Sequence, residues 1–238
     1  MELDGADYAI FTDGNFYYIP YFDPTEGFAS LNNTAITQPI TQSGENAVVV
    51  NLCFGAGTLI ATPTGERVVE SLRIGDLITT ADGRHVPVKW LGQQTHQTPA
   101  VNMRLPDRAQ PVRIRAGALG GGLPHTDLLV TGDHAMLLDG MLINAAALVN
   151  GASIDWVPMA ELGNSFTVYH VEVEAHEVIL ANGAQTESFV DVAGRKTFDN
   201  YNAYMARYGS ERIIPEMRVP RITAQRMVPA YIGDRHAS

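Results

Sequence analysis

The sequence contains a single cysteine, Cys53, among its 238 residues. One cysteine cannot form a disulfide within the chain, and it cannot by itself build a metal cage. No apolar run approaches the roughly 18 residues that a membrane-spanning helix needs. The N-terminal residues are acidic and lack the basic and apolar regions of a standard signal peptide, so we expect none. Localisation stays open between the cytoplasm and export by a non-classical route.

Positive charge is also scarce, with 16 Lys and Arg against 26 Asp and Glu and a formal net charge of -10. This balance disfavours nucleic acids and anionic membranes as partners. Residues 1–52 contain seven acidic side chains and no Lys or Arg, whereas residues 190–238 contain eight basic and five acidic ones. We therefore predict three segments. They are an acidic N-terminal arm at 1–52, a central domain at 53–190 and a basic C-terminal tail at 191–238.

Helical periodicity and internal repeats are largely lacking. Instead, short β-prone runs flank turn-forming pairs, which are Thr64-Gly65, Asp82-Gly83, Asp139-Gly140 and Asn182-Gly183. This pattern is typical of an all-β fold built from short strands and hairpins. Two short helices are predicted, one at Ala145–Val149 and one at Thr197–Tyr208 that Gly209 ends. The tail beyond the second helix is predicted to be extended.

Cys53 is the first candidate for chemistry. It follows an apolar stretch, Val48–Leu52, that we expect to be a strand, and it opens a glycine-rich run, Cys53–Thr62. A thiol is a strong nucleophile once it is deprotonated, and glycines let the backbone approach it closely. The function therefore depends on whether residues further along the chain can activate this sulfur.

Two later stretches contain residues that could act on such a thiol. Thr131 and His134 lie three residues apart across an expected tight turn, so both can point at one peptide bond. His170 lies on a predicted strand at 165–174. Because side chains alternate along a strand, His170 is expected to face away from Val171 and Val173.

Three blocks of residues occur in an informative order. They are Cys53-Phe54-x-x-Gly57-Thr58, then Thr131-x-x-His134, then Tyr169–His176 with Asn182-Gly183 after it. In this order they resemble the Hint family, the self-processing domains of inteins and of Hedgehog C-terminal regions. Val69–Asp76 also matches the family's Val-x-x-Leu-x-x-Gly-Asp stretch. Pro111–Ile114 and Asp133-His134-Ala135 resemble bacterial Hint-type proteins in particular. The resemblance covers about residues 53–190.

The resemblance implies a horseshoe-like all-β domain that attacks the peptide bond before its first residue. In this chain that bond joins Leu52 to Cys53. The Cys53 Sγ would attack the Leu52 carbonyl, and this N-to-S acyl shift would give a thioester. His134 is the candidate proton donor to the leaving nitrogen, and Thr131 would orient the scissile peptide.

The sequence also departs from the intein pattern. Inteins end in His-Asn, but Glu187 and Ser188 stand at that place here, so splicing is not expected. Water or a small external nucleophile would then resolve the thioester and release residues 1–52, the chain's own substrate, in a single turnover without a cofactor or metal. His170 stands where inteins often have an Asp and is expected to assist the second step. His176 matches a family histidine that often serves structure.

Two alternatives from other functional classes stay open. Cys53 could be a buried, inert side chain in a silent Hint scaffold that acts as a structural or interaction module. The chain could also be a Cys-His hydrolase that acts on other substrates. A zinc site built from His134, His170 and His176 is not favoured, because the metal-ligand spacing is absent. Thiol reactivity of Cys53 separates an active site from a silent one.

Overall fold

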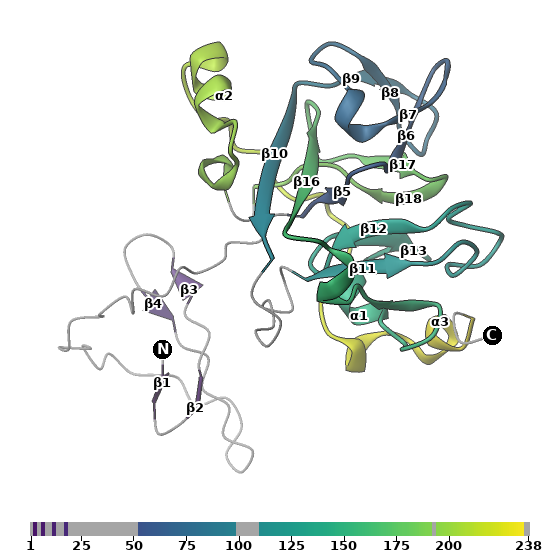
Figure 1. Cartoon of the computed structure of the whole chain (residues 1–238). Helices are drawn as coiled ribbons and strands as arrows, with labels where there is room; N and C mark the ends of the chain where they lie inside the picture. Colours follow the sequence, from purple (N-terminus) through teal and green to yellow (C-terminus); the bar gives the residue numbers. More distant parts are fainter. Residues whose placement is uncertain are drawn as a thin grey trace. The chain divides into compact units, whose positions relative to one another are not determined.

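The structure is a computed structural model that describes residues 52–98, 110–191 and 194–235, together with four two-residue strands near the N-terminus (Figure 1). The chain divides into two compact units, Met1–Asn46 and Ala47–Ser238. In the first unit two antiparallel pairs form, β1 (Glu2–Leu3) with β2 (Ala6–Asp7) and β3 (Phe11–Thr12) with β4 (Tyr17–Tyr18). The predicted strand before Cys53 lies outside the described residues except for Leu52.

Two sheets dominate the second unit (Figure 1). The six-stranded sheet has the spatial order β10 (Trp90–Gln97), β16 (Ser165–Glu172), β5 (Phe54–Gly55), β12 (Leu128–Thr131), β11 (Pro111–Ile114) and β15 (Ile154–Trp156). The seven-stranded sheet has the order β19 (Arg221–Ile222), β14 (Met141–Asn144), β13 (Ala135–Leu138), β18 (Ala184–Glu187), β17 (Val178–Ala181), β6 (Leu59–Thr62) and β7 (Gly65–Val68). A separate hairpin joins β8 (Leu77–Thr79) to β9 (His85–Pro87). The all-β prediction is therefore confirmed.

Helices in the described part of the chain are short. The α-helices are α1 (Ala145–Leu148), α2 (Tyr201–Tyr208) and α3 (Ala230–Arg235), and the 3-10 turns are η1 (Val69–Ser71), η2 (Met159–Glu161), η3 (Arg195–Thr197) and η4 (Gln225–Met227). Among the described residues no helix is long and apolar enough to cross a membrane.

The turn pairs produce the hairpins that the sequence predicts. Asp139 and Gly140 connect β13 to β14 with φ angles of 47° and 77°, and Asn182 and Gly183 connect β17 to β18 with 48° and 78°. Two successive positive φ angles define the type I′ turn, whose twist matches that of the two strands it joins. Asp-Gly and Asn-Gly tolerate this conformation, so these sequence pairs fix where the strands reverse.

The second predicted helix begins four residues later than expected. Phe198 adopts an extended conformation (φ -85°, ψ 141°) after η3, which keeps η3 and α2 separate. Its ring is buried, so tertiary packing overrides the helical tendency of this stretch. The helix end is as predicted, because Gly209 takes the left-handed conformation (φ 74°) and its N–H bonds to the Met205 carbonyl oxygen.

Strand β16 separates two hydrophobic cores. Val171 and Val173 belong to the larger core, which fills the space between the sheets. Val168 belongs to a second, smaller cluster, in which the buried members are Cys53, Trp90, Val168, Phe189, Phe198, Tyr204 and Ile214. The His170 ring lies against Phe189 of this smaller cluster, with 4.7 Å between ring centroids. The predicted parity of His170 is therefore confirmed.

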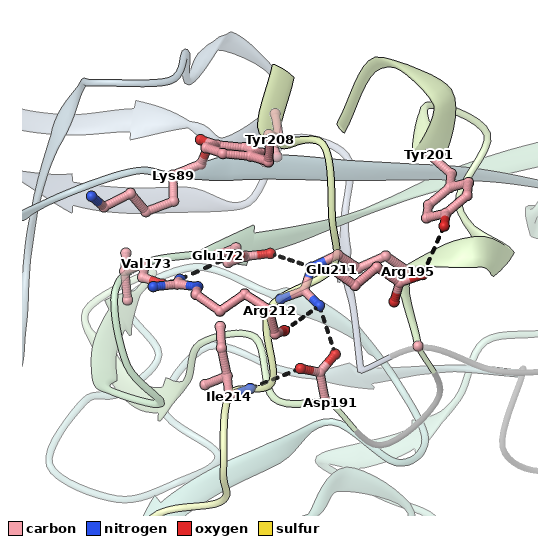
Figure 2. A network of polar contacts seen from close by, with 12 residues as sticks. Lys89, Glu172, Val173, Asp191, Arg195, Tyr201, Tyr208, Glu211, Arg212 and Ile214 are labelled. Carbon is pink, nitrogen blue, oxygen red and sulfur yellow. Dashed lines mark hydrogen bonds and ion pairs between the residues drawn. The ribbon is translucent and has the colours of Figure 1, made fainter. Parts of the chain in front are cut away.

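The C-terminal segment, residues 194–235, packs into this unit through ion pairs of its arginines. Arg195 is 0% exposed and forms ion pairs with Glu172 at 2.7 Å and with Asp191 at 2.8 Å (Figure 2). Figure 2 also shows Arg212 reaching the same Glu172. Further on, Arg221 pairs with Glu187, and its strand β19 lies parallel to β14. The segment is thus held by charge pairs as well as by its aromatic side chains.

Candidate functional site

Cys53 lies directly before β5, at the edge where this short strand meets β12. The Cys53 N–H donates to Thr131 Oγ1 at 2.9 Å, and the Thr131 N–H donates to the Cys53 carbonyl oxygen at 2.9 Å. Antiparallel pairing of Val130 with Phe54 sets this alignment. One residue therefore holds both backbone polar groups of Cys53, including the nitrogen of the Leu52–Cys53 bond.

The Cys53 thiol faces His170. Sγ lies 3.8 Å from His170 Nδ1, and both side chains are buried. Burial raises the pKa of the Cys53 thiol well above its usual value. Burial, together with the neighbouring His134, lowers the pKa of His170 well below its usual 6.5. At neutral pH the two groups are therefore a neutral thiol and a neutral imidazole, with the thiol donating.

His134 is buried and follows the turn that Gly132 and Asp133 form after β12. Its N–H donates to the Thr131 carbonyl oxygen at 3.0 Å, which closes that turn. Its ring nitrogen Nε2 lies 2.7 Å from Thr186 Oγ1, while Nδ1 is buried without a well-formed hydrogen bond in the described part of the chain. Burial lowers the pKa of His134 to about 4, although the Glu187 carboxylate and the Leu52 backbone act in the opposite direction.

His176 has a different position. Its Nδ1 accepts the Met217 N–H at 3.0 Å, so the ring proton is on Nε2, which donates to Glu187 Oε2 at 3.0 Å. Both ring nitrogens are therefore engaged in linking β18 to the C-terminal segment. The structure brings Cys53, Thr131, His134 and His170 together around the Leu52–Cys53 bond, and it gives His176 a supporting position beside them.

Glu187 and Ser188, which replace the intein His-Asn pair, are both engaged in the fold. Glu187 Oε1 accepts the Ala135 N–H at 2.7 Å, directly after His134. Burial opposes ionisation of Glu187, but the hydrogen bond from His176 and the Arg221 guanidinium outweigh it and lower its pKa to about 2. Ser188 Oγ accepts the Glu177 N–H at 2.9 Å. Neither side chain carries an amide that could cyclise.

Sequence reasoning missed two residues of this site, Thr186 and Arg221. Thr186 reaches His134 because β18 pairs with β13 and sets Thr186 opposite Met136. Thr186 lies two residues before Ser188, in the stretch that aligns with the end of inteins. This position could have identified Thr186 as a candidate site residue. Arg221 lies in the C-terminal segment, outside the resemblance, and no sequence pattern ties it to Glu187.

The side chains of Cys53, Thr131, His134 and His170 are all buried. A cavity of about 450 Å³ lies nearby, lined in part by Lys89, Tyr204, Tyr208 and Arg212, but Cys53 does not line it. Among the residues that the structure describes, no group of three or more His, Cys, Asp or Glu side chains is arranged to hold a metal ion. The reactive groups that the described residues bring together here are the thiol, the two imidazoles and the Thr131 hydroxyl.

The comparisons with known proteins agree with this architecture. The family model of the Hint domain matches residues 52–193, which is more than half of the chain. This chain therefore belongs to the Hint domain family, whose members include the self-processing domains named above, and it has the all-β fold of that family.

Individual relatives match smaller parts of this chain than the family model does. Iron-sulfur cluster assembly SufBD family proteins of Mycobacterium tuberculosis and Mycobacterium bovis are 35% identical over 96 residues, which is 35% of this chain but 11% of those proteins. The chain thus spans about a tenth of the length of these curated relatives. Among solved structures, a bacterial intein-like domain from Clostridium thermocellum is 15% identical and covers 58% of this chain and 98% of its own, with a TM-score of 0.43. The MchDnaB-1 intein is 20% identical and covers 56% and 98%, with a TM-score of 0.41.

Proposed function

We propose that this chain is a self-processing Hint domain that cuts its own Leu52–Cys53 bond once. The proposal rests on two contacts of Cys53, one at its backbone nitrogen and one at its thiol. Its nitrogen donates to Thr131 Oγ1 at 2.9 Å, while its thiol faces His170 Nδ1 at 3.8 Å. The attacking sulfur and the leaving nitrogen belong to one residue, so the attack is intramolecular and needs no substrate binding.

The first step is an N-to-S acyl shift. The Cys53 Sγ forms a bond to the Leu52 carbonyl carbon, and the carbon–nitrogen bond between Leu52 and Cys53 breaks. The thiol loses one proton and the departing nitrogen gains one, so the products are a thioester and a free α-amine. In the resting site both imidazoles are neutral, as burial lowers the pKa of His134 to about 4 and that of His170 well below 6.5. The proton that reaches the nitrogen therefore has to come from the thiol.

We assign the two histidines to a proton relay. His170 Nδ1 accepts the proton as the Cys53 sulfur attacks. His134 is the neighbouring ring, with 6.3 Å between the two ring centroids, and the Leu52 backbone also acts on it. His134 receives the proton from His170 and delivers it to the Cys53 nitrogen. One proton thus moves from sulfur to nitrogen, and both rings end neutral.

Water or a small nucleophile resolves the thioester. Water adds its hydroxyl to the Leu52 carbonyl carbon and returns a proton to Cys53 Sγ. Residues 1–52 leave with a C-terminal carboxylate, and Cys53 becomes a new N-terminus. Splicing is not part of the proposal, because Glu187 and Ser188 offer no amide for the cyclisation that splicing requires.

Intact mass measurement tests this function. Purified full-length chain is incubated with and without a small thiol, beside a Cys53→Ala variant. We expect loss of the mass of residues 1–52 only when Cys53 is present, and faster with thiol. Full-length mass throughout, or an equal loss from Cys53→Ala, would contradict the proposal. A Ser188→Ala variant should still be cut, which separates cleavage from a splicing-type reaction.

A second function has one specific observation in its favour. The Cys53 side chain is 0% exposed and burial raises the pKa of its thiol, as expected for a silent scaffold. Alkylation of the native chain by a small thiol-reactive compound distinguishes a processing site from a silent scaffold. A processing site reacts on the time scale of cleavage, whereas a silent site reacts only after unfolding.

A further inference from the structure

The carboxylate of Glu187 is buried where β18 meets the C-terminal segment, and its side chain is 0% exposed. Oε1 accepts the Ala135 N–H at 2.7 Å, and Ala135 directly follows His134. Oε2 accepts from His176 Nε2 at 3.0 Å. The Arg221 guanidinium bonds to both oxygens, from Nη1 to Oε1 at 3.1 Å and from Nη2 to Oε2. Each oxygen of this carboxylate therefore has two donors.

Arg221 supplies the positive charge that offsets this carboxylate. His176 cannot do so, because its Nδ1 accepts the Met217 N–H at 3.0 Å and has no place for a second proton while that bond stands. A guanidinium is charged at every ordinary pH, and its planar fork fits the two oxygens of one carboxylate. Burial of a carboxylate without such a partner is costly. The ion pair therefore explains how a charged Glu187 can lie inside the domain.

Both members of the ion pair act on His134. The Glu187 charge favours protonation of the His134 ring, and the Arg221 charge opposes it. The other titratable groups that act on this ring are His176 and His170, and the ring of His170 is 6.3 Å away between centroids. Because the two full charges oppose each other, burial dominates and keeps the ring neutral at neutral pH. Without Arg221, the carboxylate would act on the ring unopposed.

We infer that Arg221 is a positioning residue that balances the Glu187 charge and thereby keeps His134 uncharged. It also holds the carboxylate on the Ala135 N–H, which fixes the backbone beside His134. The consequence for cleavage rests on the function proposed above, in which His134 takes a proton from His170. A ring that is already protonated cannot take one. The C-terminal segment, which lies beyond the residues that the family model matches, thus contributes to the site through β19.

Ring NMR of His134 tests this inference independently of cleavage. The full-length Cys53→Ala chain, which stays uncut, is labelled with ¹⁵N-histidine, and a His134→Gln variant of it assigns the signals. The His134 ring should titrate with a midpoint at about pH 4 in this parent chain. Arg221→Met should raise the midpoint by about one pH unit or more, because an unbalanced carboxylate favours the charged ring. Addition of Glu187→Gln should return the midpoint to the parental value or below it. No rise in Arg221→Met would overturn the inference.

Arg212→Met is the matched control, since Arg212 belongs to the same segment but forms its ion pairs with Glu172 and Glu174. It should leave the His134 midpoint unchanged, and a rise equal to that of Arg221→Met would overturn the inference. If Arg221→Met does not fold, the double variant with Glu187→Gln decides. It removes both charges and should fold. A double variant that also fails to fold would show that Arg221 serves packing, which would equally overturn the inference.

Cleavage rates give the functional readout in the chain that retains Cys53. Arg221→Met should slow cleavage by roughly 10- to 100-fold, up to the loss that a small misplacement of reacting groups can cause. Addition of Glu187→Gln should recover most of the rate, because the amide oxygen can still accept the Ala135 N–H and has no charge. A loss that Glu187→Gln does not repair, or faster cleavage by Arg221→Met, would overturn the catalytic part of the inference. No cleavage in the parent chain would count against the proposed function, while the NMR midpoint would still decide the role of Arg221.

Discussion

At the scale of single residues, Cys53 supplies both the attacking sulfur and the leaving nitrogen of the proposed reaction. Thr131 accepts the Cys53 N–H and His170 faces the sulfur, so the two ends of the proposed reaction are contacted from different strands, β12 and β16. Burial keeps the thiol and both imidazoles neutral at rest. A site of this kind cannot rely on a preformed thiolate. In the proposed reaction the thiol proton has to move during the attack. The rate of cleavage is therefore expected to depend on His134 and His170.

The first prediction concerns how these histidines act together. His170→Gln and His134→Gln should each slow cleavage by about 10²- to 10⁴-fold, the usual worth of a general acid–base group. Because the relay passes one proton through both rings in series, the double variant should be little slower than the slower single variant. Cleavage rates from intact mass over time measure this. Fully additive losses would show that the two rings act independently.

A second prediction concerns stability in mild acid. Burial lowers the pKa of His134 from 6.5 to about 4, so between these values the unfolded chain binds a proton that the folded chain does not. Stability is therefore lost as pH falls through this window, by about 3 kcal/mol for His134 alone. His170 acts in the same direction, since its pKa is lowered too. Denaturant unfolding of Cys53→Ala across this range measures the loss.

The control for this prediction is His134→Gln in the same background, which should flatten the pH dependence. Glu187 contributes separately and at lower pH. Its pKa is lowered from 4.5 to about 2, so its stabilisation is present above 4.5 and is lost as pH falls towards 2. Stability that stays constant from neutral pH down to about 4 would contradict the assignment of a buried neutral His134.

At the scale of elements, β10 and the turn before α2 meet at a glycine. A Cβ placed on Gly92 would lie 2.8 Å from two ring carbons of Phe198 and 2.9 Å from the Trp90 ring. Phe198 and Trp90 pack edge to face, with 5.0 Å between centroids, in the cluster that contains Cys53. A strand glycine usually weakens a strand, so its presence here reflects the space that Phe198 needs.

The third prediction follows from this contact. Gly92→Ala should destabilise the chain by about 1–3 kcal/mol, because overpacking outweighs the roughly 0.5–1 kcal/mol that alanine gains over glycine within a strand. Displacing Phe198 should also open the cluster and speed alkylation of the Cys53 thiol. Gln97→Ala, at the exposed end of the same strand, is the matched control and should change neither. A more stable Gly92→Ala variant with an unreactive thiol would contradict this packing.

At the scale of the whole molecule, the C-terminal segment is part of the domain's interior beyond the residues that the family model matches. Its Phe198, Tyr204 and Ile214 complete the cluster around Cys53. Arg195 lies between the rings of Phe189 and Tyr204, at 4.4 Å and 4.9 Å from their centroids, while it pairs with Glu172. Three arginines of this segment, Arg195, Arg212 and Arg221, therefore form ion pairs with carboxylates of the domain.

The fourth prediction tests this role. Arg195→Met leaves Glu172 buried with its Arg195 pair removed, and breaking a buried pair in this way typically costs about 3–5 kcal/mol. Arg226→Met, at an exposed position of the same segment, should cost less than about 0.5 kcal/mol. Denaturant unfolding of both variants measures the difference. Equal, small losses would show that the segment is dispensable for the fold.

Much of the fold follows from local sequence signals. Asp139-Gly140 and Asn182-Gly183 fix two hairpins because few other pairs accept two positive φ angles. Alternation along β16 correctly predicts the direction of His170. The neighbours of Cys53 could be predicted only through the order of the family blocks, because Thr131 and His170 are 78 and 117 residues away in sequence.

The rest depends on contacts that no local pattern encodes. The pairing of Arg221 with Glu187 requires β19 to lie beside β14, and the pairing of Arg195 with Glu172 requires the C-terminal segment to cross β16. The late start of α2 has the same origin, since burial of Phe198 outweighs helix propensity. Long-range packing of a segment outside the family blocks is what the sequence alone did not reveal.

The most direct test of the account is to trap the thioester on Leu52. Freshly purified full-length chain is treated with hydroxylamine at neutral pH, and the released fragment is identified by intact mass, with Cys53→Ala as the control. The proposed acyl shift predicts a fragment of residues 1–52 that carries a hydroxamate at Leu52, formed only when Cys53 is present. A cut at another bond, a fragment that also forms from Cys53→Ala, or no fragment at all would contradict it.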